Sequence, residues 1–378
     1  MTTNHLFEIQ EYGQSIWMDN LSRDAIESGE LKEAIVTRSL RGITSNPAIF
    51  EKAIAGNQIY DADIEAGIKD GKSVTEIYES LVFDDIRNAC DIFKPVYEQT
   101  NGVDGYISIE VPPDIARDTE TTISEARRYH KAVDRPNVMI KIPGTPEGLP
   151  AVEQAISDGI SVNVTLLFSV QAYIDTFWAY IKGLEARVEK GESIDNIASV
   201  ASFFLSRIDS EVDGRIDKML AETSDADEKA KLESIKGKVA IANAKIAYQE
   251  YKKILATDRW QALAAKGAKV QRLLWASTST KNPAYSDVMY VDELVGPDTV
   301  NTLPPNTIEA CADHCDVASR VETDIDGAKQ TMATLAEVGI DVDEVMAQLL
   351  DEGIDKFIKP FESLMTSLED KVKQLAPV

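Results

Sequence analysis

Cysteine is scarce in this 378-residue chain, which contains only three. Three thiols are too few for a disulfide framework in a chain of this length. Cys311 and Cys315 have the i,i+4 spacing of a helix, but His314 is the only histidine near them. Two thiols on a helix are therefore favoured over a metal site. We expect neither a metal ion nor another cofactor.

Positive charge is also in short supply. Lys and Arg total 39 against 64 Asp and Glu, which gives a formal net charge of −25. Such an acidic surface repels nucleic acid and anionic lipid, so neither is an expected partner. The same imbalance makes a local cluster of positive charge informative, because an anionic substrate would need one.

Long apolar runs and a targeting signal are absent as well. No apolar run approaches the about 20 residues that cross a membrane, and the N-terminus lacks the basic and apolar regions of a signal peptide. With 44% hydrophobic and 27% charged residues, the composition is that of a globular protein with a sizeable core. We expect a reduced, soluble, cytoplasmic protein.

What the sequence does contain is a regular alternation of short β-type runs and longer amphipathic stretches. The predicted strands are Ser15–Asp19, Gly42–Asn46, Gly105–Val111, Val138–Ile142, Ser161–Leu167, Ser199–Phe204, Val270–Ser277 and Thr299–Leu303. The predicted helices include Val74–Phe93, Asp118–Ala132, Pro150–Ser157, Val170–Glu189, Arg207–Leu220 and Asp227–Leu255. Eight strands alternating with helices predict the α/β class and a single (β/α)8 TIM barrel. A doubly wound open sheet is the alternative, but the dinucleotide fingerprint is missing.

The C-terminal part, about residues 306–378, is predicted to be helical without strands. Asp326–Val338 and Val342–Leu368 have regular apolar spacing, and Gly339 and Gly353 punctuate them. No Pro-, Gly- or Ser-rich linker divides the chain. We therefore expect one domain over residues 1–378, with the C-terminal helices packed on the barrel or over its mouth.

Polar residues share the inward side of the predicted strands. Alternate residues of a barrel strand point inside, so helix-facing Ile140 and Ile142 leave Lys141 inward. The same parity, or a position near a strand's carboxyl end, places inside Asp19, Thr44, Asn46, Ser108, Glu110, Asn163, Thr165, Ser202 and Ser277. An internal salt-bridge network is the alternative interpretation. A catalytic site is favoured, because these residues gather at the end where barrel active sites lie.

A buried lysine among carboxylates and hydroxyls predicts covalent chemistry. A lysine desolvated inside a barrel loses part of its proton affinity and attacks a carbonyl, such as C2 of a ketose, to give an imine. The protonated imine withdraws electrons, so the C3–C4 bond can break without a metal. Asp19 suits proton transfer at the C4 hydroxyl, and Glu110 with Thr165 suits holding a water that moves protons.

Three further residues predict a phosphate site. Arg207 opens the helix after the sixth strand and can bind a phosphate with two nitrogens. Ser277 and Lys281 follow the seventh strand, where barrels often bind phosphate. In so acidic a chain, these cations favour an anionic substrate.

Six segments, in order along the chain, resemble the motifs of transaldolases. They are GITSNPAIFEKAI (42–54), SIEVPP (108–113), VMIKIPGTPEG (138–148), NVTLLFS (163–169), SFFLSRID (202–209) and RLLWASTSTKNPAYSD (272–287). The resemblance implies a (β/α)8 barrel and an enzyme of the pentose phosphate pathway. It implies transfer of a dihydroxyacetone unit from sedoheptulose 7-phosphate or fructose 6-phosphate to glyceraldehyde 3-phosphate or erythrose 4-phosphate. It also suggests a homodimer.

The resemblance implies roles for individual residues. Lys141 would form the Schiff base, Asp19 would be the acid/base, and Glu110 and Thr165 would hold the water. Those implied to contact substrate or its phosphate are Thr44, Asn46, Asn163, Ser202, Phe204, Arg207 and Ser277. Many transaldolases have an arginine two residues after that serine, where this chain has Ser279. We expect Lys281 to supply the missing charge.

Two other functions are compatible with the same fold. A fructose 6-phosphate aldolase releases dihydroxyacetone freely, but such enzymes are shorter and usually lack the equivalent of Asp19. A non-catalytic sugar-phosphate-binding barrel would lack Lys141 or Asp19, and both are present.

Overall fold

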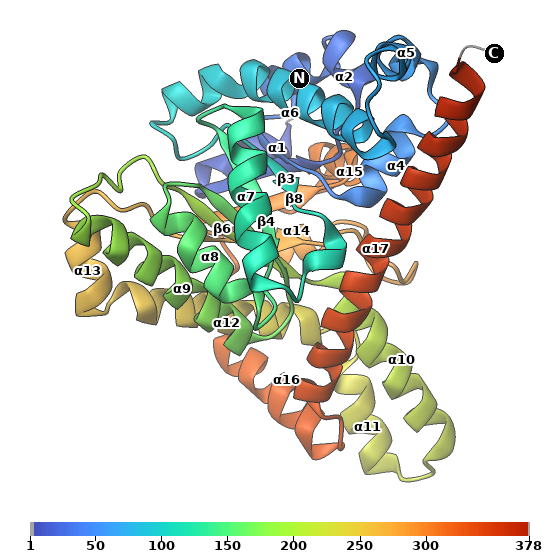
Figure 1. Ribbon diagram of the computed structural model, residues 1–378. Helices are drawn as coiled ribbons and strands as arrows, with labels where there is room; N and C mark the ends of the chain where they lie inside the picture. The colour runs from blue at the N-terminus through green and yellow to red at the C-terminus, as the bar shows by residue number, and fades with distance from the viewer. Residues whose placement is uncertain (1–3, 377–378) are drawn as a thin grey trace.

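The computed structural model describes residues 4–376 and closes eight parallel strands into a barrel (Figure 1). The strands are β1 (Gln14–Asp19), β2 (Leu40–Thr44), β3 (Tyr106–Glu110), β4 (Val138–Pro143), β5 (Val162–Leu167), β6 (Ser199–Phe204), β7 (Arg272–Ala276) and β8 (Thr299–Leu303). Each strand pairs with the next, and β8 pairs with β1. The predicted TIM-barrel fold is confirmed.

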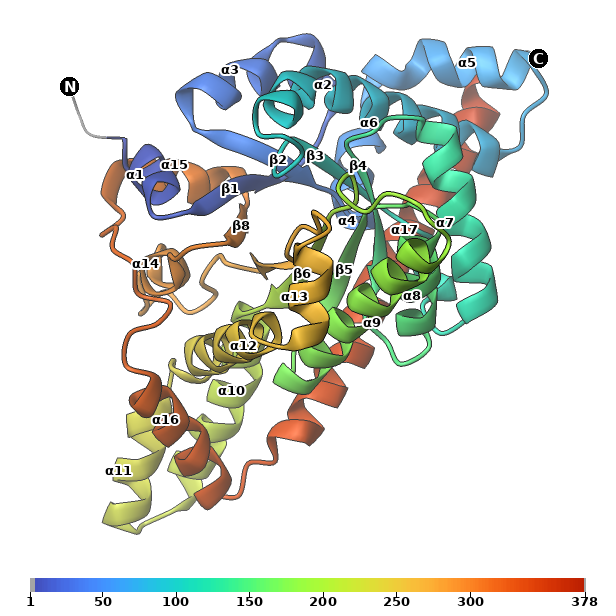
Figure 2. The same cartoon turned by 90° about the vertical axis from the view of Figure 1, so that its left-hand side faces the viewer.

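Helices form a layer outside the barrel (Figure 2). In the first half they are α1 (His5–Glu11), α2 (Arg23–Glu27), α3 (Glu30–Thr37), α4 (Pro47–Ile54), α5 (Asp61–Lys69), α6 (Val74–Gln99), α7 (Thr119–Val133), α8 (Gly148–Ser157) and α9 (Val170–Glu189). The second half adds α10 (Ser206–Glu222), α11 (Ala226–Ile235), α12 (Val239–Leu255), α13 (Asp258–Ala264), α14 (Met289–Leu294), α15 (Pro305–His314), α16 (Ile325–Glu337) and α17 (Val342–Leu375). Short 3-10 turns cover Gln58–Tyr60 and Pro113–Ile115.

A buried ion pair closes the amino-terminal end of the barrel. Arg272 of β7 donates to Asp104 at 2.9 Å, and both side chains are 8% exposed. Asp104 also accepts hydrogen bonds from Ser15 Oγ at 2.6 Å and from the indole of Trp17 at 3.1 Å. Gly42 leaves room for that indole, because a Cβ at Gly42 would lie 2.6 Å from the ring. This network, called the barrel floor below, joins β1 and β7 to the loop before β3.

The predicted strands that end at Asn46, Val111 and Ser277 extend past the observed carboxyl ends of β2, β3 and β7. Asn46 lies beyond β2 and is the N-cap of α4, where its side chain accepts a hydrogen bond from the amide of Ile49. An asparagine followed by proline is a common helix start, because Pro47 needs no amide partner there. Ser277 lies beyond β7 and has a left-handed backbone with φ 56°. This left-handed residue follows the last residue of β7 and turns the chain away from the strand direction.

The predicted helix Asp227–Leu255 is two helices, α11 and α12. Gly237 separates them with φ 69°, a conformation that glycine adopts without steric cost. Gly353, which was expected to punctuate the predicted helix Val342–Leu368, lies inside α17 and does not end it. A Cβ at this position would lie 2.9 Å from Leu166 Cδ2, so glycine lets the helix approach the barrel closely.

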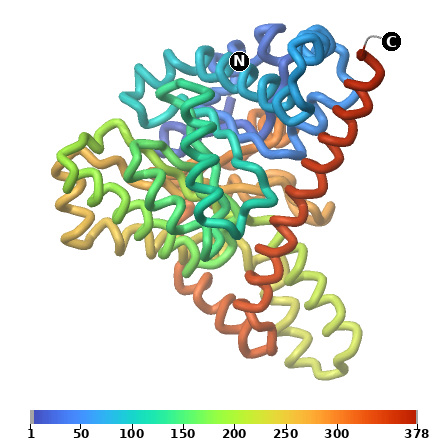
Figure 3. The backbone as a smooth tube through the Cα atoms, in the orientation of Figure 1, coloured from blue at the N-terminus to red at the C-terminus, as the bar shows by residue number. Residues whose placement is uncertain are grey.

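The C-terminal helix α17 runs along the outside of the barrel and over part of its mouth (Figures 1 and 3). It packs against α4, α6 and α10 and also touches the end of β5. The expectation that C-terminal helices pack on the barrel fits this arrangement, whereas the single-domain boundary stays a prediction. Within residues 4–376, no helix combines the length and the apolar character of a membrane span.

We predict that Asp104→Asn destabilises the protein by about 3–5 kcal/mol, because it leaves the Arg272 charge buried and without its partner. Urea unfolding measures the difference. The matched control is Asp91→Asn, which breaks an ion pair with Arg135 whose side chains are 52% and 31% exposed. The control should cost about 1 kcal/mol or less. If the two variants lose the same free energy of unfolding, the buried ion pair of the barrel floor contributes no more to stability than an exposed one.

Candidate active site

A cavity of about 360 Å³ opens at the carboxyl ends of the strands. All but two of the predicted site residues line it, and those two are Glu110 and Asn163. The lining residues that were predicted are Asp19, Thr44, Asn46, Lys141, Thr165, Ser202, Phe204, Arg207, Ser277 and Lys281. They come from several strands and the loops that follow them, as expected of a barrel active site.

Lys141 points inward from β4 beside Glu110 of β3. The two residues are directly opposite each other in the parallel β3–β4 ladder, so the register of the barrel brings them together. Lys141 Nζ lies 3.4 Å from Glu110 Oε2 and donates a hydrogen bond to the backbone oxygen of Ser45 at 3.1 Å. The two side chains are 5% and 2% exposed. The amine is thus buried and held at one edge of the cavity.

The side-chain oxygens of Glu110 and Thr165 are buried and could accept further hydrogen bonds. In the described part of the chain, neither Glu110 oxygen nor Thr165 Oγ1 has a hydrogen-bond partner, although all three atoms are buried. Burial raises the pKa of Glu110 to about 7, and the positive charge of Lys141 opposes this shift. Buried polar groups of this kind suit ligand atoms or a bound water. A carboxyl group with a near-neutral pKa can both give and take a proton.

Asp19 is a second, half-buried carboxylate on the same cavity. Its Oδ1 accepts a hydrogen bond from Thr44 Oγ1 at 2.7 Å, and that hydroxyl lies 2.7 Å from Thr302 Oγ1. Burial raises the pKa of Asp19, while the charge of Lys141 and the hydrogen bond from Thr44 lower it. The Thr44 contact fixes one carboxylate oxygen and leaves the group facing the cavity.

Asn163 lies one layer deeper than the cavity lining. Its Oδ1 accepts from Ser202 Oγ at 2.7 Å, and its Nδ2 donates to Ser108 Oγ at 3.1 Å. The side chains of Ser108, Asn163 and Ser202 thereby link β3, β5 and β6. This chain of hydrogen bonds orients Ser202, which does line the cavity.

Two cations lie at the side of the cavity formed by α10 and the loop after β7. Burial lowers the pKa of Arg207, whose Nη1 is buried without a hydrogen-bond partner in the described residues. Its guanidinium carbon lies 5.2 Å from the ring centroid of Phe204. Lys281 Nζ donates to Ser279 Oγ at 2.8 Å, and burial followed by the charge of Arg207 lowers its pKa. Neighbouring cations that repel each other favour an anion between them.

The backbone is strained at two points of the cavity rim. Leu166, next to Thr165, has φ 60°, and Ser277 has φ 56°. The pairing of β5 with β6 shifts register between Val164 and Leu167, so Leu166 lies in an irregular strand end. Left-handed backbone is rare outside glycine and is commonly found where a side chain must be aimed at a ligand.

Several lining residues were missed in the sequence, chiefly Lys52, Thr302 and Phe357. Thr302 faces inward on β8 and could have been found from the alternation of that strand. Lys52 follows Asn46 on α4, within the segment GITSNPAIFEKAI. Phe357 comes from α17, with its ring centroid 5.6 Å from Lys141 Nζ and 5.9 Å from the guanidinium carbon of Arg207. The sequence has no signal for it, because one phenylalanine in an apolar helix face looks like any other.

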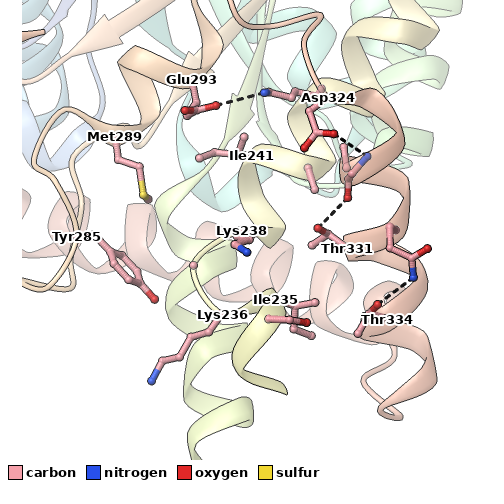
Figure 4. Close-up of a pocket in the computed structure, with 17 residues that line it drawn as sticks. Ile235, Lys236, Lys238, Ile241, Tyr285, Met289, Glu293, Asp324, Thr331 and Thr334 are labelled. Atoms are coloured by element: carbon pink, nitrogen blue, oxygen red, sulfur yellow. Dashed lines mark hydrogen bonds and ion pairs between the residues drawn. The ribbon is translucent and has the colours of Figure 1, made fainter. Parts of the chain in front are cut away.

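A larger cavity of about 670 Å³ lies between α12, α14 and α16 and contains none of the predicted site residues (Figure 4). Its polar groups largely pair with one another. Lys245 lies 3.3 Å from Glu293, and Asp324 accepts from the amide of Gly327 as the N-cap of α16. Over residues 4–376, no three His, Cys, Asp or Glu side chains gather as metal ligands would. The barrel mouth is therefore the candidate active site.

Known proteins resemble the chain along its whole length. A family model described as transaldolase/fructose-6-phosphate aldolase matches residues 16–368. The chain is 74% identical to a protein named transaldolase from Trichodesmium erythraeum and 66% identical to transaldolase 2 of Nostoc punctiforme, over the whole of each chain. It is 44% identical to a transaldolase of Frankia alni over 98% of both chains. These similarities cover the barrel and the C-terminal helices alike.

The raised pKa of Glu110 predicts a pH dependence of stability. The folded chain binds this proton more tightly than the unfolded chain, so the contribution of Glu110 to stability is lost as the pH rises from 4.5 to about 7. Relative to Glu110→Gln, the wild type should lose about 3 kcal/mol over that range. Urea unfolding at several pH values measures it. In the control, Glu98→Gln alters a side chain that is 62% exposed, and its curve should run parallel to that of the wild type. A parallel curve for Glu110→Gln would contradict the prediction.

Proposed function

Because the chain belongs to the transaldolase/fructose-6-phosphate aldolase family, we propose that it transfers a dihydroxyacetone unit between sugar phosphates through a Schiff base on Lys141. The donors are ketose phosphates such as sedoheptulose 7-phosphate or fructose 6-phosphate. The acceptors are aldose phosphates such as glyceraldehyde 3-phosphate or erythrose 4-phosphate. The observation that carries the proposal is the buried Lys141 amine, 3.4 Å from Glu110, at the edge of a cavity that Asp19 also lines.

Imine formation comes first. The neutral amine of Lys141 attacks C2 of the donor ketose and forms a carbinolamine, which loses water to become a protonated imine. Protons must move between the nitrogen and the departing hydroxyl during these steps. Glu110 has a near-neutral pKa, and the Thr165 hydroxyl has no hydrogen-bond partner in the described part of the chain. Both features support this role for a bound water between the two side chains.

Cleavage and transfer follow from the imine. Asp19 takes the proton of the C4 hydroxyl, the C3–C4 bond breaks, and its electrons move into the imine to give an enamine. The aldose phosphate leaves, and an acceptor aldehyde takes its place. The enamine carbon attacks that aldehyde, and Asp19 returns the proton to the new hydroxyl. Hydrolysis of the new imine then releases the new ketose phosphate, which has three carbons more than the acceptor, and restores Lys141.

The phosphate of each substrate is assigned to Arg207, Ser277 and Lys281. Arg207 offers a buried nitrogen that has no hydrogen-bond partner within residues 4–376, and Lys281 adds a second positive charge beside it. Phe204 and Phe357 wall this side of the cavity and limit solvation of the guanidinium. An ion pair formed there is stronger than one on the surface.

A fructose 6-phosphate aldolase would use the same lysine but would release dihydroxyacetone to water. Full-length similarity to proteins named transaldolase favours transfer, and the carboxylate of Asp19 is present. A non-catalytic sugar-phosphate binder has no use for a buried lysine beside two carboxylates. The cytoplasmic location and the homodimer stay predictions from the sequence.

The Schiff base can be trapped. Borohydride added with fructose 6-phosphate should reduce the imine and leave a covalent adduct on Lys141, which peptide mass spectrometry locates. Lys141→Arg should form no adduct and transfer nothing, because a guanidinium cannot supply a free amine. The control Lys94→Arg changes a side chain that is 56% exposed on α6, and it should react like the wild type. An adduct on Lys52 or Lys281, with Lys141 unmodified, would refute the assignment.

Arg207 and Lys281 should contribute unequally to the binding of the substrate phosphate. We expect Arg207→Ala to raise the KM for fructose 6-phosphate more than Lys281→Ala does, because Arg207 can form two hydrogen bonds with the phosphate. Each such bond to a charged group contributes about 1.5–3 kcal/mol. Steady-state kinetics give both constants. Unphosphorylated dihydroxyacetone donors serve as the control and should be little affected. An unchanged KM in Lys281→Ala would remove Lys281 from the phosphate site.

A further inference from the structure

Two aspartates lie one helical turn apart on α10, and each accepts hydrogen bonds from a backbone amide and from a tyrosine hydroxyl. Asp209 accepts one hydrogen bond from the backbone amide of Ala240 at 2.8 Å and another from the hydroxyl of Tyr290 at 2.7 Å. Asp213 accepts from the amide of Gly237 at 2.9 Å and from the hydroxyl of Tyr285 at 2.6 Å. Both aspartates are buried. Each therefore joins the start of α12 to the part of the chain that follows β7.

Neither aspartate is neutralised by a cation. Among residues 4–376, the groups that donate to Asp209 and Asp213 are backbone amides and tyrosine hydroxyls, and neither carboxylate forms an ion pair. Helix α12 has Lys238 at its N-cap and no side-chain cap of its own, so Asp209 supplies an acceptor to the unpaired amides of its first turn. A negative charge is favourable at this end of a helix. The amides account for one oxygen of each carboxylate and leave the other for a tyrosine.

The tyrosines belong to the segment that contains the proposed phosphate residues. Segment 277–290, called the phosphate segment below, starts at Ser277, includes Lys281, and ends with Tyr285 and Tyr290. Its first residue is tied to the start of α10, because the amide of Ser206 donates to the backbone oxygen of Ser277 at 3.0 Å and the two hydroxyls lie 2.8 Å apart. The phosphate segment is thus fastened to α10 at three levels, and Lys281 lies between the first and the last.

These attachments oppose a repulsion. Arg207, near the start of α10, and Lys281 line the same cavity, so their positive charges repel each other. Burial, followed by the charge of Arg207, lowers the pKa of Lys281. Close packing also fixes the Tyr285 ring. A Cβ at Gly237 would lie 2.6 Å from Tyr285 Cζ, so the ring rests directly on that backbone.

We propose that Asp209 and Asp213, acting through Tyr290 and Tyr285, are positioning residues that hold Lys281 and Ser277 toward Arg207 before the phosphate binds. The proposal rests on the proposed function, since it assumes that these residues receive a sugar phosphate. A site preformed in this way loses less conformational entropy on binding. The effect should therefore appear in affinity for phosphorylated substrates and not in the chemical step.

The alternative is that the aspartates only cap α12. Tyr285→Phe and Tyr290→Phe separate the two roles, because each removes one hydroxyl and leaves the aspartate bonded to the helix amides. Tyr248→Phe is the matched control. Its hydroxyl donates to the backbone oxygen of Pro297 at 2.9 Å, and within residues 4–376 it forms no hydrogen bond with Asp209, Asp213 or the phosphate segment.

The test uses the full-length protein and three measurements. Calorimetry gives the affinity for inorganic phosphate, and steady-state kinetics with fructose 6-phosphate as donor give KM and kcat for erythrose 4-phosphate and for unphosphorylated glyceraldehyde. Melting temperatures report on stability. We expect Tyr285→Phe and Tyr290→Phe to weaken phosphate binding and raise the KM for erythrose 4-phosphate by roughly three- to tenfold, the loss of about one hydrogen bond. The KM for glyceraldehyde and kcat should stay within about twofold, and Tyr248→Phe should change the melting temperature alone.

Two outcomes would overturn the positioning role. One is that the Tyr285 and Tyr290 variants behave like Tyr248→Phe, with a lower melting temperature and unchanged phosphate affinity. The other is an equal rise in KM for both acceptors. Failure of the proposed function looks different, because the wild type would then transfer nothing from fructose 6-phosphate to erythrose 4-phosphate. Phosphate binding by calorimetry needs no turnover and still tests the positioning role in that case.

Discussion

The close approach of Lys141 to Glu110 inside the barrel is the constraint on which the rest of the site depends. The register of two neighbouring strands places the amine and the carboxylate opposite each other, 3.4 Å apart and nearly excluded from solvent. Charges so deeply buried are costly unless other groups compensate them. The backbone oxygen of Ser45 accepts a hydrogen bond from the Lys141 amine, and the Thr44 hydroxyl donates one to Asp19 nearby. Each compensating group lies at a strand end, so the closed barrel is what makes the chemistry possible.

Burial of that pair needs a cover that the barrel itself does not supply. Helix α17 provides it, because Phe357 lies within 6 Å of both Lys141 and Arg207. Gly353, one turn earlier, lets the helix contact Leu166, whose left-handed backbone adjoins Thr165. The C-terminal helix thus helps to exclude water from the site, and it packs against the residue that adjoins Thr165. A dry site strengthens every electrostatic interaction in it.

Strand alternation was sufficient to predict most of the site, and it failed for identifiable reasons. Within a strand the period is two, so Lys141, Glu110 and Thr165 could be placed inward from their apolar neighbours. Past the last ladder residue the period no longer holds. Asn46 is oriented as a helix cap and Ser277 by a left-handed backbone, so their exact positions required the fold. Phe357 reaches the site only through the packing of α17, which no local pattern records.

The partners of the buried aspartates on α10 affect how Arg207 and Lys281 can bind an anion. With a net charge of −25, a carboxylate paired with Arg207 would have been easy to provide, yet it would compete with the substrate phosphate. The buried aspartates of α10 instead accept from amides and tyrosine hydroxyls. Those donors carry no full charge, so they fix the surrounding backbone while Arg207 and Lys281 keep their field directed at the cavity. In a chain so rich in acid, Arg207 and Lys281 form no ion pair with any residue that the structure describes. Their charges therefore focus positive potential at the mouth of the barrel and favour the approach of a phosphate.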